Sequence, residues 1–290
     1  MSGFSAIWLA QRETADARAR SRELVGTLPR KFSEIVDLGA GTGANFRWLA
    51  PQLDSGQHWT LIDNDSKLLV AARKATRVWA KSSGCRASGR GNKLSITDSG
   101  FDCTIKTQQL DLSKNLSELE LPANSLVTAS ALFDLVSKAW LEKLVTRLAA
   151  SGASVLWTLS YDGRVMIDPA LDDDNTIIAL LNRHQLTDKG FGPALGPDAW
   201  LVAQSLLEHA GFNVRVVDSS WNCGSKDKDL LKTLIEGWTE AAMAVSPADK
   251  AVIEKWSEHR LKKAAAGKLQ VSVGHRDLAA QPGAASAQPR

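Results

Sequence analysis

The feature that most constrains this chain is a glycine-rich turn at residues 35–43 (Ile-Val-Asp-Leu-Gly-Ala-Gly-Thr-Gly). It joins an apolar segment, in which Val36 and Leu38 favour a strand, to a segment with helical character. Glycine has no Cβ, so such a turn lets the backbone approach a ligand closely. It also directs the free N–H groups of the following helix toward that ligand. The turn therefore predicts a binding site for a nucleotide-like molecule at the end of the first strand.

Strand-like and helix-like segments alternate after this turn. Strands are expected at about 33–38, 58–63, 103–110, 126–131, 153–160, 213–218 and 269–273, and helices at about 43–52, 66–82, 137–150 and 198–210. A second apolar run at 94–97 suggests a hairpin-like extension before the third strand. The alternation predicts an α/β fold with a three-layer, doubly wound, mostly parallel seven-stranded sheet.

Five segments describe the expected organisation. They are an N-terminal helical cap at 1–30, the main domain at 31–278, a polar glycine-rich loop at 164–196, a helical insertion at 219–267 and a disordered tail at 279–290. Apart from a short helix-like run at 175–184, the loop has little pattern for a core, and we expect it to form a lid or part of a substrate pocket. For the N-terminal helical cap, a lid over the glycine turn is the alternative role.

Composition excludes several classes of protein. The net charge is only +3, and the three cysteines are scattered without a C-x-x-C pair. That usage predicts neither a zinc site nor a disulfide framework, and we expect no bound metal. Apolar runs are too short for a signal-peptide core or a membrane span. The chain is therefore expected in the cytoplasm.

Carboxylates follow the predicted parallel strands. Asp37 precedes the glycines, Asp63 ends the second strand 24 residues beyond Gly39, and Asp111 follows the third strand. The carboxyl ends of parallel strands share one edge of a sheet, where ligands bind. A carboxylate at the position of Asp63 is suited to bind the two hydroxyls of a ribose.

The run Asp37-Leu-Gly-Ala-Gly-Thr-Gly43, Asp63 and Leu110-Asp111-Leu112 together resemble class I S-adenosylmethionine-dependent methyltransferases. So does the order of elements from 33 to 160. The expected strands at 213–218 and 269–273 resemble that family's closing antiparallel pair, interrupted here by the helical insertion. The resemblance implies a Rossmann-like methyltransferase, a transferase that uses S-adenosyl-L-methionine.

The resemblance also implies residue roles at the methionine end of that cofactor. Asp37 would orient the ammonium group, and Gly39 and Gly41 would let the backbone approach. Ala129 and Ser130 would line the cofactor near its sulfonium.

At the adenosine end, the resemblance implies that Asp63 holds the ribose hydroxyls and that Asn64 flanks the adenine. Asp111 would accept a hydrogen bond from the adenine amino group, with Leu112 donating its backbone N–H.

A sulfonium methyl is already activated, so transfer is an in-line displacement that depends on positioning and, for some acceptors, on removal of a proton. Catalytic candidates beyond the fourth and fifth strands and in the loop are His184, Tyr161 and Asp134, with His184 the first choice as base. Lys189 and Arg164 are suited to hold an anionic group of the acceptor.

The favoured function is methyl transfer to a small molecule that the sequence does not identify. Residues 130–134 (Ser-Ala-Leu-Phe-Asp) lack the Asn/Asp-Pro-Pro-Tyr/Phe motif of amino-directed nucleic-acid methyltransferases. One alternative is an RNA methyltransferase that uses the basic segment 67–93, in which RNA is a partner that we do not favour. Another is a non-catalytic, methyltransferase-like binding protein. Neither DNA nor a membrane is expected as a partner.

Overall fold

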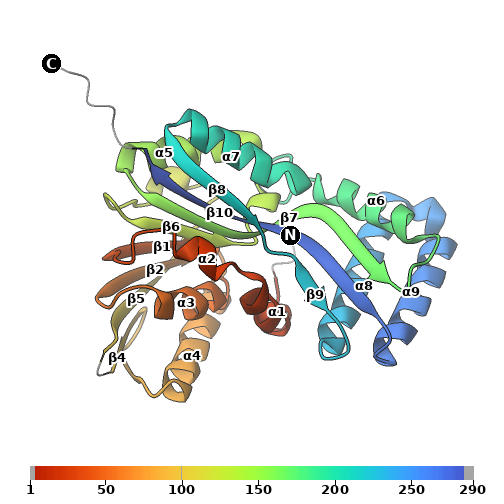
Figure 1. The fold of residues 1–290 in the computed structure, drawn as a ribbon, viewed down its shortest axis with the longest axis horizontal. Helices are drawn as coiled ribbons and strands as arrows, with labels where there is room; N and C mark the ends of the chain where they lie inside the picture. Colours follow the sequence, from red (N-terminus) through yellow and green to blue (C-terminus); the bar gives the residue numbers. More distant parts are fainter. Residues whose placement is uncertain (1–3, 99, 284–290) are drawn as a thin grey trace.

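A mostly parallel sheet organises the computed structural model, which describes residues 4–98 and 100–283 (Figure 1). The sheet order is β3-β4-β5-β2-β1-β6-β7-β10-β8, with β9 paired to β10. The strands are β1 Glu34–Leu38, β2 Gln57–Asp63, β3 Arg86–Ser88, β4 Lys93–Thr97, β5 Asp102–Gln109, β6 Leu126–Ser130, β7 Ser154–Asp168, β8 Phe212–Asp218, β9 Trp221–Cys223 and β10 Gln270–Pro282.

Strands β5, β2, β1, β6 and β7 are parallel neighbours, as the alternating pattern predicts. The predicted closing pair is confirmed: β10 runs antiparallel to β8, and it lies between β8 and β7. The described part of the chain holds ten strands in place of the seven expected. The hairpin extension β3–β4 and the short β9 account for the difference.

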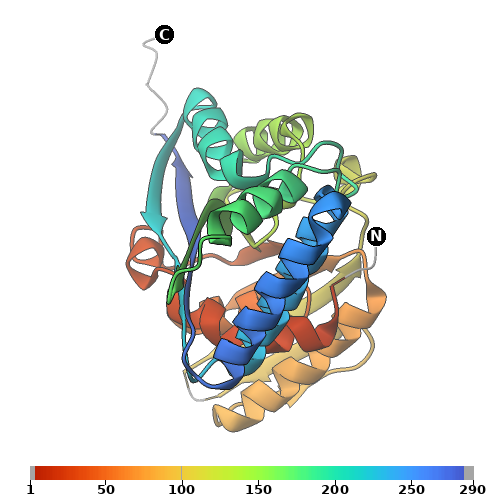
Figure 2. The same ribbon diagram turned by 90° about the vertical axis from the view of Figure 1, so that its right-hand side faces the viewer.

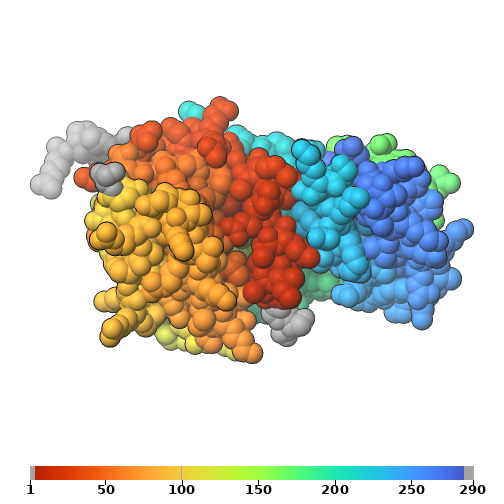
Figure 3. Space-filling model, turned by 90° about the horizontal axis from the view of Figure 1, so that it is seen from below, coloured from red at the N-terminus to blue at the C-terminus, as the bar shows by residue number. Residues whose placement is uncertain are grey.

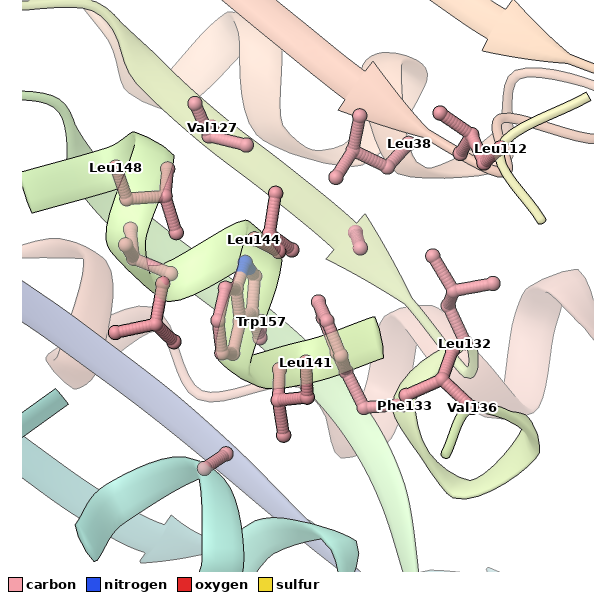
Figure 4. Packing of buried hydrophobic residues seen from close by; sticks show 14 of the residues in the cluster. Leu38, Leu112, Val127, Leu132, Phe133, Val136, Leu141, Leu144, Leu148 and Trp157 are labelled. Carbon is pink, nitrogen blue, oxygen red and sulfur yellow. The ribbon is translucent and has the colours of Figure 1, made fainter. Parts of the chain in front are cut away.

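Helices cover both faces of this sheet. They are α1 Ala6–Ala19, α2 Arg22–Val25, α3 Ala44–Leu49, α4 Ser66–Ser82, α5 Lys138–Ser151, α6 Asp174–Gln185, α7 Ala199–His209, α8 Lys228–Val245 and α9 Lys250–Ala265. Alternate strand residues point to opposite faces, so Val36 packs toward α5 and α7 while Ile35 packs toward α2 and α3. Figure 4 shows the first of these cores, with α5 residues Leu141, Leu144 and Leu148 against β6 and β7. The three-layer architecture is confirmed.

A second core lies where β7 and β10 extend beyond their neighbours (Figures 1 and 2). Helices α6, α8 and α9 pack there, and Asp174 of α6 accepts hydrogen bonds from Trp256 and Arg260 of α9. The segment expected as a loop at 164–196 is therefore regular structure over much of its length, and the helix-like run at 175–184 corresponds to α6. Strand β7 continues to Asp168 and α6 begins at Asp174, because this helical lobe supplies partners that local sequence does not reveal.

Three further boundaries differ from expectation. The cap at 1–30 consists of two helices that break at Arg20 and Ser21. The insertion at 219–267 contains the expected helices and also β9. The tail predicted to be disordered from 279 is strand through Pro282, because Ala279 and Ala280 are buried between β7 and β8. Residues 284–290 lie outside the described residues.

Among the described residues, no helix combines the length and the apolar character that a membrane span requires.

Candidate functional site

A cavity of about 420 Å³ lies at the carboxyl ends of the parallel strands. It surrounds the glycine turn after β1. Strand β1 lies between β2 and β6, so this is the point in the sheet where the strand order reverses. This is where open α/β sheets bind ligands. Eight of the nine residues predicted to hold the cofactor line it: Asp37, Gly39, Gly41, Asp63, Asn64, Asp111, Leu112 and Ser130.

The glycine turn requires its glycines. Gly39, Gly41 and Gly43 have φ values of 64°, 53° and 77°, in the left-handed region that side chains disfavour. A Cβ at Gly41 would also lie 3.0 Å from the Leu9 side chain of α1. The turn therefore needs glycine both for its backbone conformation and for the close approach of α1.

The Asp63 carboxylate fixes the shape of this turn. Its Oδ2 accepts from the backbone N–H of Gly41 at 2.8 Å, and its Oδ1 accepts from the backbone N–H of Asp65 at 2.9 Å. Burial raises the pKa of Asp63. The end of β2 and the turn after β1 are thus one hydrogen-bonded unit at the wall of the cavity.

Asp37 is buried in the floor of the cavity with only one oxygen satisfied. Its Oδ1 accepts from Asn45 Nδ2 at 2.8 Å, and Asn45 also donates to Thr128 at 3.0 Å. Its Oδ2 has no hydrogen-bond partner among the described residues. Burial raises the pKa of Asp37 to about 7. A buried carboxylate oxygen without a donor calls for a ligand that supplies one.

Arg20 faces the same cavity with unpaired donors. Its Nη2 donates to Ser130 Oγ at 2.8 Å, whereas Nε and Nη1 are buried without partners among the described residues. Burial lowers the pKa of Arg20. Sequence reasoning missed this residue because the segment around it holds several arginines, and only the break between α1 and α2 turns Arg20 inward.

Hydrogen bonds hold the predicted adenosine side of the site in place. Asp111 Oδ1 accepts from the hydroxyl of Ser113 at 2.6 Å and from its N–H at 3.0 Å, and the hydroxyl contact is the main cause that lowers the pKa of Asp111. Trp140 donates to the carbonyl of Leu112 at 2.7 Å. These bonds leave Asp111 at the cavity edge with its second oxygen beside Lys114.

Ala129 does not line the cavity, in contrast to the prediction. Its side chain is buried in the core between β6 and α5, because the alternation along β6 turns Ser130 toward the cavity and Ala129 away. Ala131 lines the cavity in its place. It has a φ of 53°, which is uncommon for a residue with a Cβ and typical of functional sites.

The three residues predicted as catalytic lie behind the cavity wall formed by the described residues. Asp134 lies two residues after the lining residue Leu132, and burial raises its pKa to about 6. Its Oδ1 is buried and has no hydrogen-bond partner in the described part of the chain. Tyr161 donates to Asn182 at 2.7 Å, and burial raises its pKa. His184 lies in the last turn of α6 and not in a loop. Its Nδ1 is 3.3 Å from the Nζ of Lys189, which does line the cavity.

Helix α1 forms a wall of the cavity beside the glycine turn, which agrees better with the alternative role of the N-terminal segment as a lid than with a solvated cap. Leu9, Arg12 and Asp16 line the cavity from this helix. Arg12 donates from Nε to Asp16 at 3.0 Å, and Asp16 also accepts from Trp221 of β9 at 3.1 Å. Opposite α1, Lys189 and Phe191 close the cavity from the segment after α6. The site is therefore enclosed by segments far apart in the chain.

Comparison with known proteins yields matches at the level of structure alone. No protein-family model matches the chain, and no curated protein matches it. A cyclopropane-fatty-acyl-phospholipid synthase-like protein from Lactobacillus casei has a TM-score of 0.51 at 14% identity, with 93% of this chain and 92% of that chain covered.

Two further similar structures have lower scores. Cyclopropane synthase MmaA2 from Mycobacterium tuberculosis has a TM-score of 0.43 at 12% identity, with 93% of this chain and 83% of that chain covered. Phosphoethanolamine N-methyltransferase 2 from Haemonchus contortus, crystallised with S-adenosyl-L-methionine, has a TM-score of 0.44 at 15% identity, with 97% and 58% covered.

The sheet order, the closing antiparallel strand and the match in L. casei define the fold class. The chain has the Rossmann-like fold of class I S-adenosylmethionine-dependent methyltransferases.

Proposed function

We propose that this protein is an S-adenosylmethionine-dependent methyltransferase that acts on a small molecule. The observation that carries the proposal is the pair of unsatisfied, oppositely charged groups in one cavity: Asp37 Oδ2, and Nε and Nη1 of Arg20. An α-amino acid carries an ammonium and a carboxylate on one carbon. A zwitterion of that kind supplies the donor that Asp37 lacks and the acceptor that Arg20 lacks.

The rest of the cavity suits an adenosine. Asp63 is positioned to accept from the ribose hydroxyls, and Asp111 with the backbone of Leu112 offers an acceptor and a donor to the adenine edge. When bound, the cofactor supplies an activated methyl group. The chain's own residues orient the cofactor, and α1 with Lys189 and Phe191 excludes water from the reacting end.

Asp134 is the group that we propose as the proton acceptor. Its unpartnered oxygen and its raised pKa suit a carboxylate that takes a proton near neutral pH. Proton transfer from the acceptor would require Asp134 to reach past the lining residues Leu132 and Leu135. His184 would act only indirectly, through the position of Lys189.

The enclosure of the cavity supports a small acceptor over a macromolecular one. Helix α1 and the segment at 189–191 cover the cavity from two sides, which leaves little room for a nucleic-acid base flipped from a strand. The likeness to the L. casei structure concerns the fold alone, so the proposal of a small acceptor rests on the shape of this cavity.

Arg20→Gln tests the amino-acid subsite directly. Calorimetry should show S-adenosylhomocysteine binding to the variant roughly tenfold to hundredfold more weakly, because hydrogen bonds to charged groups contribute about 1.5–3 kcal/mol. Binding of 5′-methylthioadenosine, which lacks the amino-acid end, should stay unchanged. Arg22→Gln is the matched control, since Arg22 is exposed two residues further along. If neither adenosine ligand binds the unmodified protein and NAD does, the proposed function is wrong.

A further inference from the structure

Helix α4 presents a solvent-exposed face that differs from the faces of the other long helices. From Ser66 through Thr97 the chain contains no acidic residue. On α4 the side chains of Lys67, Lys74, Arg77 and Lys81 are exposed. At 100° per residue these four positions fall within one stripe of the helix. The basic segment noted in the sequence is thus a single continuous face.

The α4 face differs from the other long helices in how its cations are grouped. On α5, α8 and α9, several exposed lysines pair with a glutamate four residues away, as in Lys138–Glu142, Lys232–Glu236 and Lys262–Glu258. Exposed lysines there that have no ion pair among the described residues, such as Lys143 and Lys255, stand singly and form no continuous face. Among the described residues, none of the four exposed α4 cations forms an ion pair. A set of unpaired cations on a chain with a net charge of +3 creates a local positive field.

Two apolar side chains interrupt the cations. Val70 and Val78 are 56% and 65% exposed, and they fall on the same stripe as Lys67 and Lys74. A shallow groove lies beside them, between α4 and the ion pair of Glu13 with Arg47. Its α4 side is lined by Ala71, Lys74, Ala75, Val78, Trp79 and Ser82. Figure 3 shows α1 in red next to this orange region of the surface. Phosphates of a nucleic acid give valines nothing to contact, whereas a lipid headgroup region lies over an apolar layer.

We propose that the exposed face of α4 (Lys67, Val70, Lys74, Arg77, Val78 and Lys81) is a docking surface for an anionic lipid bilayer. The lysines and the arginine contact headgroup phosphates, and the valines enter the boundary between headgroups and acyl chains. This is association with the bilayer surface and needs no spanning segment. It revises the expectation that no membrane is a partner, and it stands independently of the proposed enzymatic function.

Sedimentation with vesicles tests this surface on the full chain without any cofactor. The protein should pellet with vesicles of equal parts phosphatidylcholine and phosphatidylglycerol, less so at high salt, and not with phosphatidylcholine alone. Replacing Lys67, Lys74 and Lys81 together by Gln should lower the partition coefficient on the order of a hundredfold, because each basic residue near an anionic surface contributes about a factor of five.

A matched variant replaces Lys250, Lys255 and Lys262 of α9 by Gln and changes the net charge equally; its pelleting should not change. Equal loss in both triple variants, or no pelleting of the unmodified protein with anionic vesicles at low salt, overturns the proposal. Val70→Ser with Val78→Ser should reduce pelleting severalfold. If the valine variant pellets normally while a labelled RNA binds the protein and loses affinity in the α4 variant, the face is a nucleic-acid surface and the lipid assignment is wrong.

Discussion

The carboxylate of Asp63, at the end of β2, accepts a hydrogen bond from the backbone N–H of Gly41, 22 residues earlier in the chain, at 2.8 Å. One side chain therefore holds the ligand-facing turn in place and also presents a charged edge to the cavity. The conformation of the glycine turn depends on the second strand as much as on its own glycines.

Asp63→Ala should remove the hydrogen bonds from the N–H groups of Gly41 and Asp65, and with them the proposed ribose contact. We expect the affinity for S-adenosylhomocysteine to fall at least a hundredfold in calorimetry, because the Gly41 and Asp65 N–H groups lose a charged acceptor. Asp65→Asn removes a neighbouring negative charge while it keeps the helix cap on Lys67 N–H, and it should bind almost normally. A normal affinity in Asp63→Ala would contradict the assigned role.

The raised pKa of Asp37 makes cofactor binding depend on pH. In the free protein burial raises this pKa to about 7; the hydrogen bond from Asn45 and the charge of Arg20 oppose the rise, and the charge of Asp63 adds to it. A ligand ammonium binds the carboxylate form, so affinity should rise with pH up to about 7 and then level off. Calorimetry in two buffers of different ionisation enthalpy should detect proton release below that pH. Asp37→Asn should bind more weakly at every pH and should release no proton at this site.

Asp134→Asn distinguishes a functional carboxylate from a structural one. A folded-state pKa of about 6, above the ordinary value of 3.8, means that the ionised form is destabilised by burial. The variant should therefore be more stable than the unmodified protein above pH 6, by at most about 2–3 kcal/mol, and equal to it below about pH 4. Urea unfolding at several pH values measures this. A variant that is less stable at pH 7.5 would indicate that Asp134 supports the fold.

Arg260→Ala should lower the free energy of unfolding, because it removes a buried contact in the helical lobe formed by α6, α8 and α9. Arg260 is fully buried and donates to Asp174 and, at 2.7 Å, to the carbonyl of Pro169. Removing one partner of a buried ion pair costs about 3–5 kcal/mol. Lys262→Ala, which breaks an exposed pair with Glu258 on the same helix, should cost less than about 1 kcal/mol. Equal urea midpoints for the two variants would show that the buried pair does not stabilise the lobe.

Local patterns were sufficient for the parallel half of the sheet and for most of the residues that line the cavity. The turn at 35–43, Asp63 and Asp111 each follow a strand whose apolar pattern is visible, and parallel strands place their ends at one edge. The error at Ala129 came from the alternation along β6, where a shift of one position exchanges cavity and core.

The other differences arose where segments depend on distant partners. Residues 279–282 have a weak strand pattern, yet they form strand because β7 and β8 lie on either side. His184 lies at the end of the helix-like run at 175–184, and the packing of α6 against α8 and α9 places it in a helical lobe, which the polar sequence after it does not predict. Local propensity loses to burial at such places.

The sequence by itself determined the fold class and the glycine turn with its carboxylates, because these follow from periodicity and from the conformations that glycine allows. The tertiary structure decided what faces the turn. Arg20 reaches Ser130 across 110 residues, and Asp277 joins the N–H of Ser21 to that of Leu159. Such contacts depend on how the helices pack over the sheet, and no local sequence pattern encodes that packing. The same packing leaves Lys67, Lys74, Arg77 and Lys81 of α4 exposed and, within the described part of the chain, without an ion pair.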